Sequence, residues 1–446
     1  MVRPKRLFLY SNYKTMMIYE QTLEYLYSQV PAYQREGQSA YKPGLDNSYQ
    51  LDEIFGQPHT KYPTIHVGGT NGKGSTSHTL AAILQKAGYK VGLYTSPHLI
   101  DFRERIRING EMIPKEYVVQ FVEKYKAQFE PIMPSFFELT MEMAFLYFAE
   151  QQVDVAIVEV GLGGRLDSTN IISPDLSIIT NIGLDHTQFL GNTLAEVATE
   201  KAGVIKADTP VVIGEADETE VREVFLEQAR VADALLLFAD KMVKDFKAIK
   251  QGGGWQIESA EFPQLYVELG GFAQEKNART VLAAVMMLRK MNYNISDNAV
   301  VEGFSHVTTL TGLMGRWQTV NSEPRIICDT GHNEHAMRQI VEQLKSETYD
   351  QLHIVIGMVD DKDVTAVLKL LPKDATYYFT QADIARAIPA EQLAEQAGEL
   401  GLTGSVYPIV QQAVEAAQQK AANKDLIFIG GSSFIVADAL PIWLPD

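Results

Sequence analysis

The sequence has a single cysteine, Cys328, among its 446 residues. One cysteine can form neither an intramolecular disulfide nor a cysteine metal cluster, and this usage fits the reducing cytoplasm, where we expect the protein. We also expect Cys328 to be a buried strand residue rather than a catalytic thiol, because free cysteine packs as a small hydrophobic side chain.

Basic residues are in short supply. The chain has 39 Lys and Arg residues against 56 Asp and Glu residues, which gives a formal net charge of -17. Nucleic acids and anionic membranes are bound mainly through an excess of Lys and Arg. We therefore expect neither partner, and an anionic small-molecule substrate would need a local basic site.

Long apolar runs are missing as well. No stretch approaches the length of about 20 apolar residues that a membrane-spanning helix needs. Near the start of the chain, the apolar run Leu7–Leu9 is too short for the hydrophobic region of a secretory signal. With 46% hydrophobic and 21% charged residues, the composition is that of an ordinary globular protein. At about 100–200 residues per domain, two or three domains are expected, and we favour two.

Short, wholly apolar runs alternate with amphipathic stretches along most of the chain. A first series of predicted strands covers residues 62–67, 91–94, 153–160, 176–180 and 210–213, with helices near 76–88, 115–129, 138–151 and 193–206. A second series of strands covers residues 325–328, 353–356, 377–379 and 426–429, with helices near 334–346, 363–371, 389–399 and 409–422. Apolar strands separated by helices predict a parallel sheet that is covered on both faces.

The fold class is therefore α/β, with two units in tandem. The first, residues 1–305, is predicted to have a mostly parallel sheet with an appended segment around 215–300. The second, residues 306–446, is predicted to be a smaller, Rossmann-like α/β domain. Residues 304–315 are rich in Thr and Gly and show little periodicity, so we expect the hinge between the two units there.

A glycine-rich turn follows the first predicted strand and leads into a helix. Such a turn can cradle phosphates: its backbone N–H groups face the anion, the helix N-terminus adds partial positive charge, and a lysine reaches the terminal phosphates. The pattern departs from the usual P-loop, which has a glycine in place of Val67 and a hydroxyl residue in place of Gly74. The competing interpretation is an ordinary strand–turn–helix connection. We predict a P-loop ATPase domain whose nucleotide-binding residues are Thr70, Asn71, Gly72, Lys73, Gly74 and Ser75.

Charged residues stand where two other predicted strands end. Glu159 lies near the end of one strand, and Asp185 and His186 follow the next. A carboxylate at the tip of a buried strand must be paired or bound to a metal, so Glu159 is either a magnesium ligand or the partner of Arg165 in an ion pair. The residues alone leave these two possibilities equal. Without any family resemblance, the sequence favours a structural role for His186, and it favours a solvent-exposed position on a helix for the side chain of Lys201.

Several motifs, taken in order, resemble the signature of folylpolyglutamate synthases and their bifunctional dihydrofolate synthase relatives in the Mur ligase superfamily. The resemblance extends over roughly residues 60–435. Its motifs are Gly69-Thr70-Asn71-Gly72-Lys73-Gly74-Ser75, Thr95-Ser96-Pro97-His98-Leu99 with Glu104-Arg105-Ile106-Arg107-Ile108-Asn109-Gly110, Phe137-Glu138-Leu139-Thr140, Glu159 to Asp167, Leu184-Asp185-His186 and Glu200-Lys201-Ala202-Gly203.

The resemblance implies a role for each matched residue. Lys73 and the backbone of residues 70–75 would hold the ATP phosphates. Two Mg²⁺ sites are expected, and the metal ligands that the resemblance implies are Ser96, Glu159, His186 and Lys201, the last as a carbamate. Asn277, Arg316 and Asp329 would contact the nucleotide, and His332 and Ser432 would lie near the incoming glutamate. The catalytic residues implied in this way are Lys73, Lys201, His332 and Asp329.

The reaction that the resemblance implies is ATP-dependent addition of L-glutamate to a reduced folate through an acyl phosphate, by a monomeric enzyme. Residues 1–305 would be the ATP-binding domain, of the Mur ligase central type and with folate-binding loops, and 306–446 the glutamate-ligase domain. Addition of glutamate to dihydropteroate, the dihydrofolate synthase reaction, is an open second activity. The alternatives are a Mur-type ligase for another carboxylate substrate and a non-catalytic nucleotide-binding module.

Overall fold

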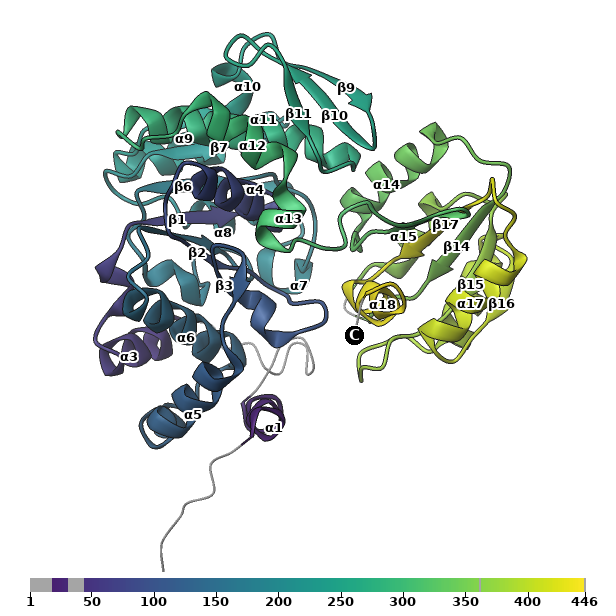
Figure 1. The fold of residues 1–446 in the computed structure, drawn as a ribbon, viewed down its shortest axis with the longest axis horizontal. Helices are drawn as coiled ribbons and strands as arrows, with labels where there is room; N and C mark the ends of the chain where they lie inside the picture. The colour runs from purple at the N-terminus through teal and green to yellow at the C-terminus, as the bar shows by residue number, and fades with distance from the viewer. Residues whose placement is uncertain (1–17, 31–43, 361, 445–446) are drawn as a thin grey trace, which may run out of the picture.

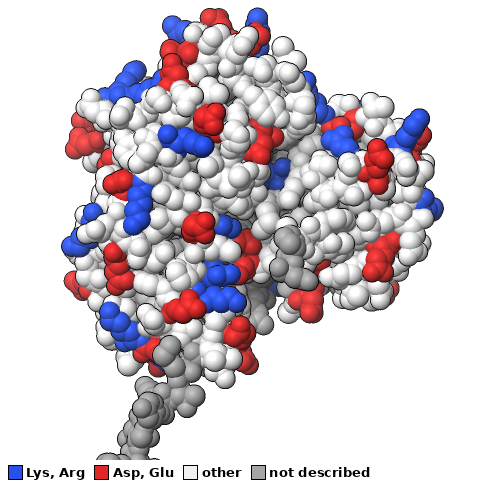
Figure 2. Space-filling model, viewed as in Figure 1, with Lys and Arg blue, Asp and Glu red and all other residues white. Residues whose placement is uncertain are grey.

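The computed structural model describes residues 18–30, 44–360 and 362–444, which form two α/β units (Figure 1). The run Leu7–Leu9 lies outside these residues. No helix of the described part is long and apolar enough to cross a membrane. On the face shown in Figure 2, acidic and basic side chains are interspersed over both units.

The N-terminal unit is built on an eight-stranded sheet with the strand order β4-β3-β2-β5-β1-β6-β7-β8. Only β3 and β4 run antiparallel to their neighbours, which confirms the mostly parallel sheet. The strands are β1 (Thr64–Gly68), β2 (Val91–Tyr94), β3 (Ile106–Ile108), β4 (Glu111–Met112), β5 (Val155–Glu159), β6 (Leu176–Ile179), β7 (Val211–Ile213) and β8 (Leu236–Phe238).

Alternate residues of the central strands face the two helical layers, as side chains of a strand must. Ile65 and Val67 of β1 pack with α4 (Lys73–Lys86), α11 (Phe272–Lys290) and α12 (Asp297–Ser305). Ala156 and Val158 of β5 face the other way. The helices on that side are α1 (Tyr19–Gln29), α3 (Asp46–Ile54), α5 (Lys115–Phe129) and α6 (Phe136–Glu150), with α7 (Thr187–Leu190), α8 (Leu194–Ala202) and α9 (Thr219–Ala232) further along the sheet. Both faces of the sheet are therefore buried.

Glu142, on α6, is an exception within this core. Its side chain is fully buried, neither carboxyl oxygen has a hydrogen-bond partner, and burial raises the pKa of the group well above 4.5, with the charge of Asp52 adding to the shift. Such a group stays protonated in the folded chain and ionises in the unfolded chain, so it costs stability as the pH rises above the unfolded pKa.

We expect Glu142→Met to raise the free energy of unfolding at pH 8 by about 1–3 kcal/mol, since it removes an unsatisfied buried polar group. The gain should shrink at pH 5, where the unfolded chain is closer to full protonation of this carboxyl. Urea unfolding at the two pH values measures the effect, with the exposed Glu116→Met on α5 as the control. A destabilised variant at pH 8 would contradict the argument.

The appended segment forms a small antiparallel sheet of β9 (Lys247–Gln251), β10 (Gly254–Glu258) and β11 (Leu265–Val267), together with α10 (Ala239–Met242). After α12, the short helix α13 (Val307–Thr311) packs against α4. Thr311 anchors it, because its Oγ1 is 2.8 Å from Nδ1 of His78 on α4.

Most of residues 304–315 is therefore helical, and the prediction of a hinge over the whole segment was wrong. Two of the threonines that weakened the helical pattern fix α13 in place: Thr311 contacts His78, and Thr308 donates hydrogen bonds to the carboxylate of Glu268. The turn between the units is shorter and lies at Gly312–Gly315, where both glycines have positive φ, 68° and 69°. The helices that pack against α4 accordingly continue to Thr311, past residue 305.

The C-terminal unit has a six-stranded sheet with the order β12-β13-β17-β14-β15-β16, in which β12 alone is antiparallel to its neighbour. Its strands are β12 (Gln318–Ser322), β13 (Arg325–Cys328), β14 (Leu352–Ile356), β15 (Thr376–Phe379), β16 (Gly404–Val406) and β17 (Leu426–Gly430). Its helices are α14 (Glu334–Ser346), α15 (Val364–Leu370), α16 (Ala390–Glu399), α17 (Val410–Lys420) and α18 (Ser433–Ala439). Cys328 is buried in β13, as predicted.

Candidate active site

The glycine-rich turn lies between β1 and α4 and has the form of a phosphate cradle. Gly69 and Gly72 have φ values of 137° and 83°, which L-residues with side chains rarely adopt. Lys73 begins α4, and its Nζ donates hydrogen bonds to the carbonyl oxygens of Gly69 (3.0 Å) and Thr70 (3.1 Å). The lysine side chain thus folds back onto the backbone of the turn, and the helix N-terminus adds partial positive charge.

Helix α11 supports this turn from the side. Nε2 of Gln274 donates to Oγ of Ser75 (3.1 Å), and Nδ2 of Asn277 donates to Oε1 of Gln274 (2.9 Å). Asn277 is buried directly against Gly72, so that a side chain at position 72 would collide with it. The predicted nucleotide contact at Asn277 therefore lies beside the phosphate loop.

Glu159 ends β5 and meets Ser96, which follows the neighbouring strand β2. Its Oε2 accepts a hydrogen bond from the backbone N–H of Ser96 (3.1 Å). Burial raises the pKa of Glu159, although the charge of Lys73 and the hydrogen bond from Ser96 oppose the shift. Arg165 pairs instead with Glu200, 2.8 Å away, so the proposed ion pair between Glu159 and Arg165 was wrong.

Lys201, on α8, is buried with 4% of its surface exposed. Its Nζ donates to the carbonyl oxygen of Gly69 (3.0 Å), the same oxygen that Lys73 contacts. Burial, with the charge of Lys73 in addition, lowers the pKa of Lys201 to about 7. The interpretation of Lys201 as a solvated helix lysine was therefore wrong. A lysine with this pKa carries a neutral amine in a substantial fraction of molecules at neutral pH.

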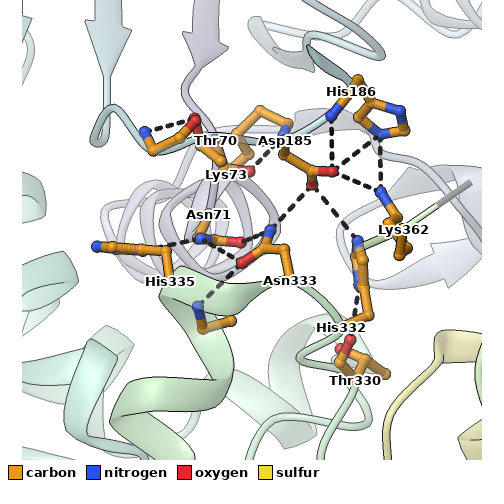
Figure 3. Close-up of polar contacts among 12 residues, drawn as sticks. Thr70, Asn71, Lys73, Asp185, His186, Thr330, His332, Asn333, His335 and Lys362 are labelled. Carbon is orange, nitrogen blue, oxygen red and sulfur yellow. Dashed lines mark hydrogen bonds and ion pairs between the residues drawn. The ribbon is translucent and has the colours of Figure 1, made fainter. Parts of the chain in front are cut away.

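Asp185 joins the two units, as Figure 3 shows. Its Oδ1 lies 2.6 Å from Nζ of Lys362, and its Oδ2 accepts from Nδ2 of Asn333 (2.9 Å). Nζ of Lys362 is also 3.2 Å from Nε2 of His186. Burial would raise the pKa of Asp185, but the hydrogen bond from His332 and the charges of His186 and Lys362 outweigh it and hold the pKa well below 3.8. The carboxylate is therefore ionised and bound from the C-terminal unit.

A reciprocal pair of amides connects the phosphate loop to α14. Nδ2 of Asn333 donates to Oδ1 of Asn71 (3.0 Å), and Nδ2 of Asn71 lies 3.2 Å from Oδ1 of Asn333 and 3.0 Å from Nδ1 of His335 (Figure 3). The Asn333 oxygen also caps α14 by accepting from the N–H of Ala336 (2.9 Å). The start of α14 is thus bound directly to the glycine-rich turn.

Arg316 and Asp329 lie on the C-terminal side of the same junction. The carboxylate of Asp329 accepts hydrogen bonds from the N–H groups of Trp317 and Gly331, both at 2.8 Å, and so fixes the backbone that carries Arg316. Burial raises the pKa of Asp329, against the effect of these N–H groups and of Arg316. A Cβ added to Gly74 would lie 3.3 Å from Nη2 of Arg316, which places the guanidinium at the first turn of α4.

Two adjoining cavities lie along the junction of the units. The larger, of about 270 Å³, has an apolar wall of Phe136, Phe137, Leu162, Leu166 and Leu190. The predicted site residues that line it are Thr70, Lys73, Ser96, His186, Lys201, His332 and Ser432. The smaller, of about 100 Å³, is lined by Gly74, Ser96, Glu159, Arg316 and His332 among others. Ser96 and His332 line both cavities. Asn71, Gly72, Ser75, Asn277 and Asp329 line neither cavity but surround them.

Among the described residues, no group of three or more His, Cys, Asp and Glu side chains is arranged to hold a metal ion by itself. The predicted ligand set includes a hydroxyl and a lysine, so such a group is not required for it. Ser96, His186 and Lys201 share the larger cavity, and Glu159 is tied to Ser96. Of these residues, Ser96 and Glu159 offer the oxygen donors that suit Mg²⁺, and His186 offers an imidazole nitrogen.

The polar residues of this junction that were not predicted as site residues include Asp185, Asn333, His335, Lys362 and Arg386. Lys362 follows β14, so the rule that ligands gather beyond the carboxyl ends of parallel strands could have indicated it. Asn333 and His335 lie next to His332 and begin a predicted helix, but nothing local points to Asn71 as their partner.

Two family models match the chain: the Mur ligase middle domain over residues 67–285, and the Mur ligase glutamate ligase domain over residues 315–433. The chain is 34% identical over 387 residues to a dihydrofolate synthase/folylpolyglutamate synthase of Escherichia coli, with 84% of this chain and 85% of that protein covered. It is 35% identical over 415 residues to a probable bifunctional folylpolyglutamate synthase/dihydropteroate synthase of Haloferax volcanii. That alignment covers 90% of this chain but only 48% of the relative, so the chain spans about half of that relative's length.

Solved structures show the same arrangement. Escherichia coli FolC in complex with DHPP and ADP aligns with a TM-score of 0.83 at 32% identity, covering 96% of this chain and 97% of the other. A bifunctional folylpolyglutamate synthase/dihydrofolate synthase with Mn, AMPPNP and L-glutamate bound aligns with a TM-score of 0.80 at 31% identity, covering 96% and 98%.

Proposed function

Because this chain belongs to the folylpolyglutamate synthase/dihydrofolate synthase family of Mur ligases, we propose that it uses ATP to join L-glutamate to a reduced folate. One observation carries the proposal: the phosphate loop of one unit and His332, Lys362 and Ser432 of the other line a single cavity. An ATP-dependent carbon–nitrogen ligase needs such a cavity, in which a phosphorylated acceptor can meet an amine.

The chemistry follows from the poor reactivity of a carboxylate toward amines. Transfer of the γ-phosphoryl group of ATP to the acceptor carboxylate gives an acyl phosphate and ADP. The amine of L-glutamate, once it has lost a proton, attacks the acyl carbon, and the amide forms as inorganic phosphate leaves. No step needs a protein nucleophile, so positioning and charge stabilisation supply most of the acceleration.

Each predicted residue has a role in this scheme. The backbone of Thr70 to Ser75 and Nζ of Lys73 would bind the phosphates, with Asn277, Arg316 and Asp329 around the nucleotide. His332 and Ser432 would hold the incoming glutamate at the C-terminal wall of the cavity. The apolar wall opposite them would accept the pteroyl group of the substrate.

A divalent cation would be held by Ser96, Glu159, His186 and Lys201, and when bound it would neutralise charge on the transferring phosphoryl group. We further propose that two such ions bind and that Lys201 acts as a carbamate, formed when its neutral amine takes up carbon dioxide and releases a proton. The low pKa of Lys201 supports this step, because only the uncharged amine reacts.

Contact between the units serves to exclude water from the acyl phosphate, which would otherwise hydrolyse. The amide pair of Asn71 and Asn333 and the ion pair of Asp185 and Lys362 hold the two units together at the edge of the cavity. Since one chain supplies every group named here, we propose a monomer, and its acidic charge and lone cysteine fit the cytoplasm.

The test is ADP release with tetrahydrofolates and with dihydropteroate, each with and without L-glutamate. We expect ADP release that requires both an acceptor and glutamate, and a product heavier than the acceptor by one glutamate residue. Turnover with dihydropteroate would establish the dihydrofolate synthase reaction as well. No glutamate-dependent turnover with any pteroyl acceptor would reject the proposal in favour of a Mur-type ligase for another carboxylate.

A further inference from the structure

We propose that Arg105 binds the α-carboxylate of a glutamate that the folate substrate already carries, and so distinguishes glutamylated folates from pteroates. The inference rests on the proposed function, since it concerns the acceptor of that reaction. Arg105 would then favour binding of an acceptor that carries glutamate, a folate, over one that does not, a pteroate.

Arg105 lies on the N-terminal wall of the larger cavity, just before β3. Its side chain is 2% exposed, and it is among the largest fully buried side chains of the described chain. The backbone carbonyl of Arg105 accepts from the N–H of Thr95 (3.0 Å), which ties it to the segment that carries Ser96. The guanidinium carbon lies 5.2 Å from the centre of the Phe136 ring, on the apolar wall where the pteroyl group would pack.

The guanidinium is held in a fixed orientation. Its Nε donates to Nδ1 of His98 (2.8 Å), so that Nδ1 must be unprotonated and Nε2 carries the proton. Nε2 lies 3.3 Å from the hydroxyl of Tyr27 on α1, and the Tyr27 ring stacks on Phe136 at 5.4 Å. His98 is therefore a positioning residue for Arg105.

The other cations of the cavity have different tasks. Lys73 and Lys201 contact the phosphate loop, and Lys362 contacts Asp185. Arg386 belongs to the C-terminal wall, where the incoming amino acid would bind. Arg105 lies beside the wall that Phe136 and Phe137 form, whereas Arg386 lies over the ring of Phe434.

The two acceptors differ in the charge that they bring to this wall. In dihydropteroate the only carboxylate is the reacting one, which must reach the phosphate loop. In a folate the reacting γ-carboxylate leaves a second, α-carboxylate on the same glutamate. A guanidinium held in one plane suits the two oxygens of a carboxylate.

The experiment compares 7,8-dihydropteroate with 7,8-dihydrofolate, which differ only by the glutamate, as ligands of the full chain in the presence of ADP. Isothermal titration calorimetry gives Kd for both. We expect Arg105→Gln to weaken dihydrofolate binding on the order of 10- to 100-fold, the size expected for a lost charge-assisted contact, and dihydropteroate binding by less than about 3-fold. Arg103→Gln is the matched control, because Arg103 is half-buried in an ion pair with Asp101 and does not line the cavity.

Two further variants separate recognition from folding. Arg105→Lys keeps the charge without the planar fork and should lose part of the dihydrofolate affinity, while ADP binding and the melting temperature show that the variant is folded. His98→Gln should give an intermediate loss for dihydrofolate alone. Equal losses for both ligands, or no loss for either, would overturn the assignment. Wild-type protein that binds neither ligand would overturn the proposed function, and the assignment with it.

Discussion

Replacement of Lys73 by alanine is expected to lower turnover by about 1,000-fold or more while leaving the fold intact. We propose Lys73 as the lysine that binds the ATP phosphates, and loss of a group that stabilises the transferring phosphoryl group commonly costs this much. Among the described residues, its Nζ donates hydrogen bonds to two backbone carbonyls of its own loop, at Gly69 and Thr70, so the core does not depend on it. Steady-state ADP release measures the first effect, and thermal unfolding measures the second.

Lys86→Ala is the control for this experiment, since Lys86 ends the same helix and forms a partly exposed ion pair with Glu302. It should change neither turnover nor melting temperature appreciably. If Lys73→Ala lowered the melting temperature in step with its activity, the loss would reflect unfolding and the catalytic assignment would fail. Turnover close to that of the wild type would refute the assignment directly.

Replacement of Lys201 by alanine should lower turnover by about 100-fold or more, with partial recovery in acetate or formate. The physical reason is that a carbamate supplies an anionic oxygen ligand, which a small carboxylate can replace in the space left by the side chain. Loss of one metal ligand or of its support commonly costs 10- to 100-fold or more. In the wild-type protein, ¹³C-bicarbonate should give a carbamate signal in the NMR spectrum that Lys201→Ala lacks.

The same signal should grow as the pH rises through about 7, because the neutral amine is the form that reacts. Lys206→Ala serves as the control: Lys206 lies one helical turn beyond α8 and donates to the carbonyl of Asn170, away from the phosphate loop. A carbamate signal that survives in Lys201→Ala would place the modification elsewhere. Rescue of Lys206→Ala by acetate would show that the anion acts non-specifically.

Hydrophobic periodicity predicted the central strands and helices of both units well, because secondary structure depends largely on local sequence patterns. The predicted strands 91–94 and 325–328 and the helices 115–129 and 334–346 have the bounds found in the structure. The two strands are mostly apolar, with Arg325 as the polar exception, and each helix has one apolar face. The short strands β3, β4 and β8 were missed, since two or three residues are too few to show an alternating pattern.

The phosphate loop and the residues at the strand ends could be located from the sequence because parallel strands bring their carboxyl ends to one edge. Contacts between segments that are distant in the sequence could not be predicted in this way. Arg165 has two acidic neighbours within reach, and only the fold shows that it pairs with Glu200 rather than Glu159. Burial of Lys201 likewise depends on how α8 packs against the loop after β1, which no local pattern reveals.

The amides of Asn71 and Asn333 have a consequence for recombining these domains. Each amide supplies both a donor and an acceptor to the other. Replacement of one asparagine alone therefore removes both of the hydrogen bonds that join Asn71 and Asn333. A chimera that takes its C-terminal half from a Mur ligase without an amide at position 333 would dock that half poorly, even if each half folded well. A functional chimera therefore needs an asparagine at both positions, 71 and 333.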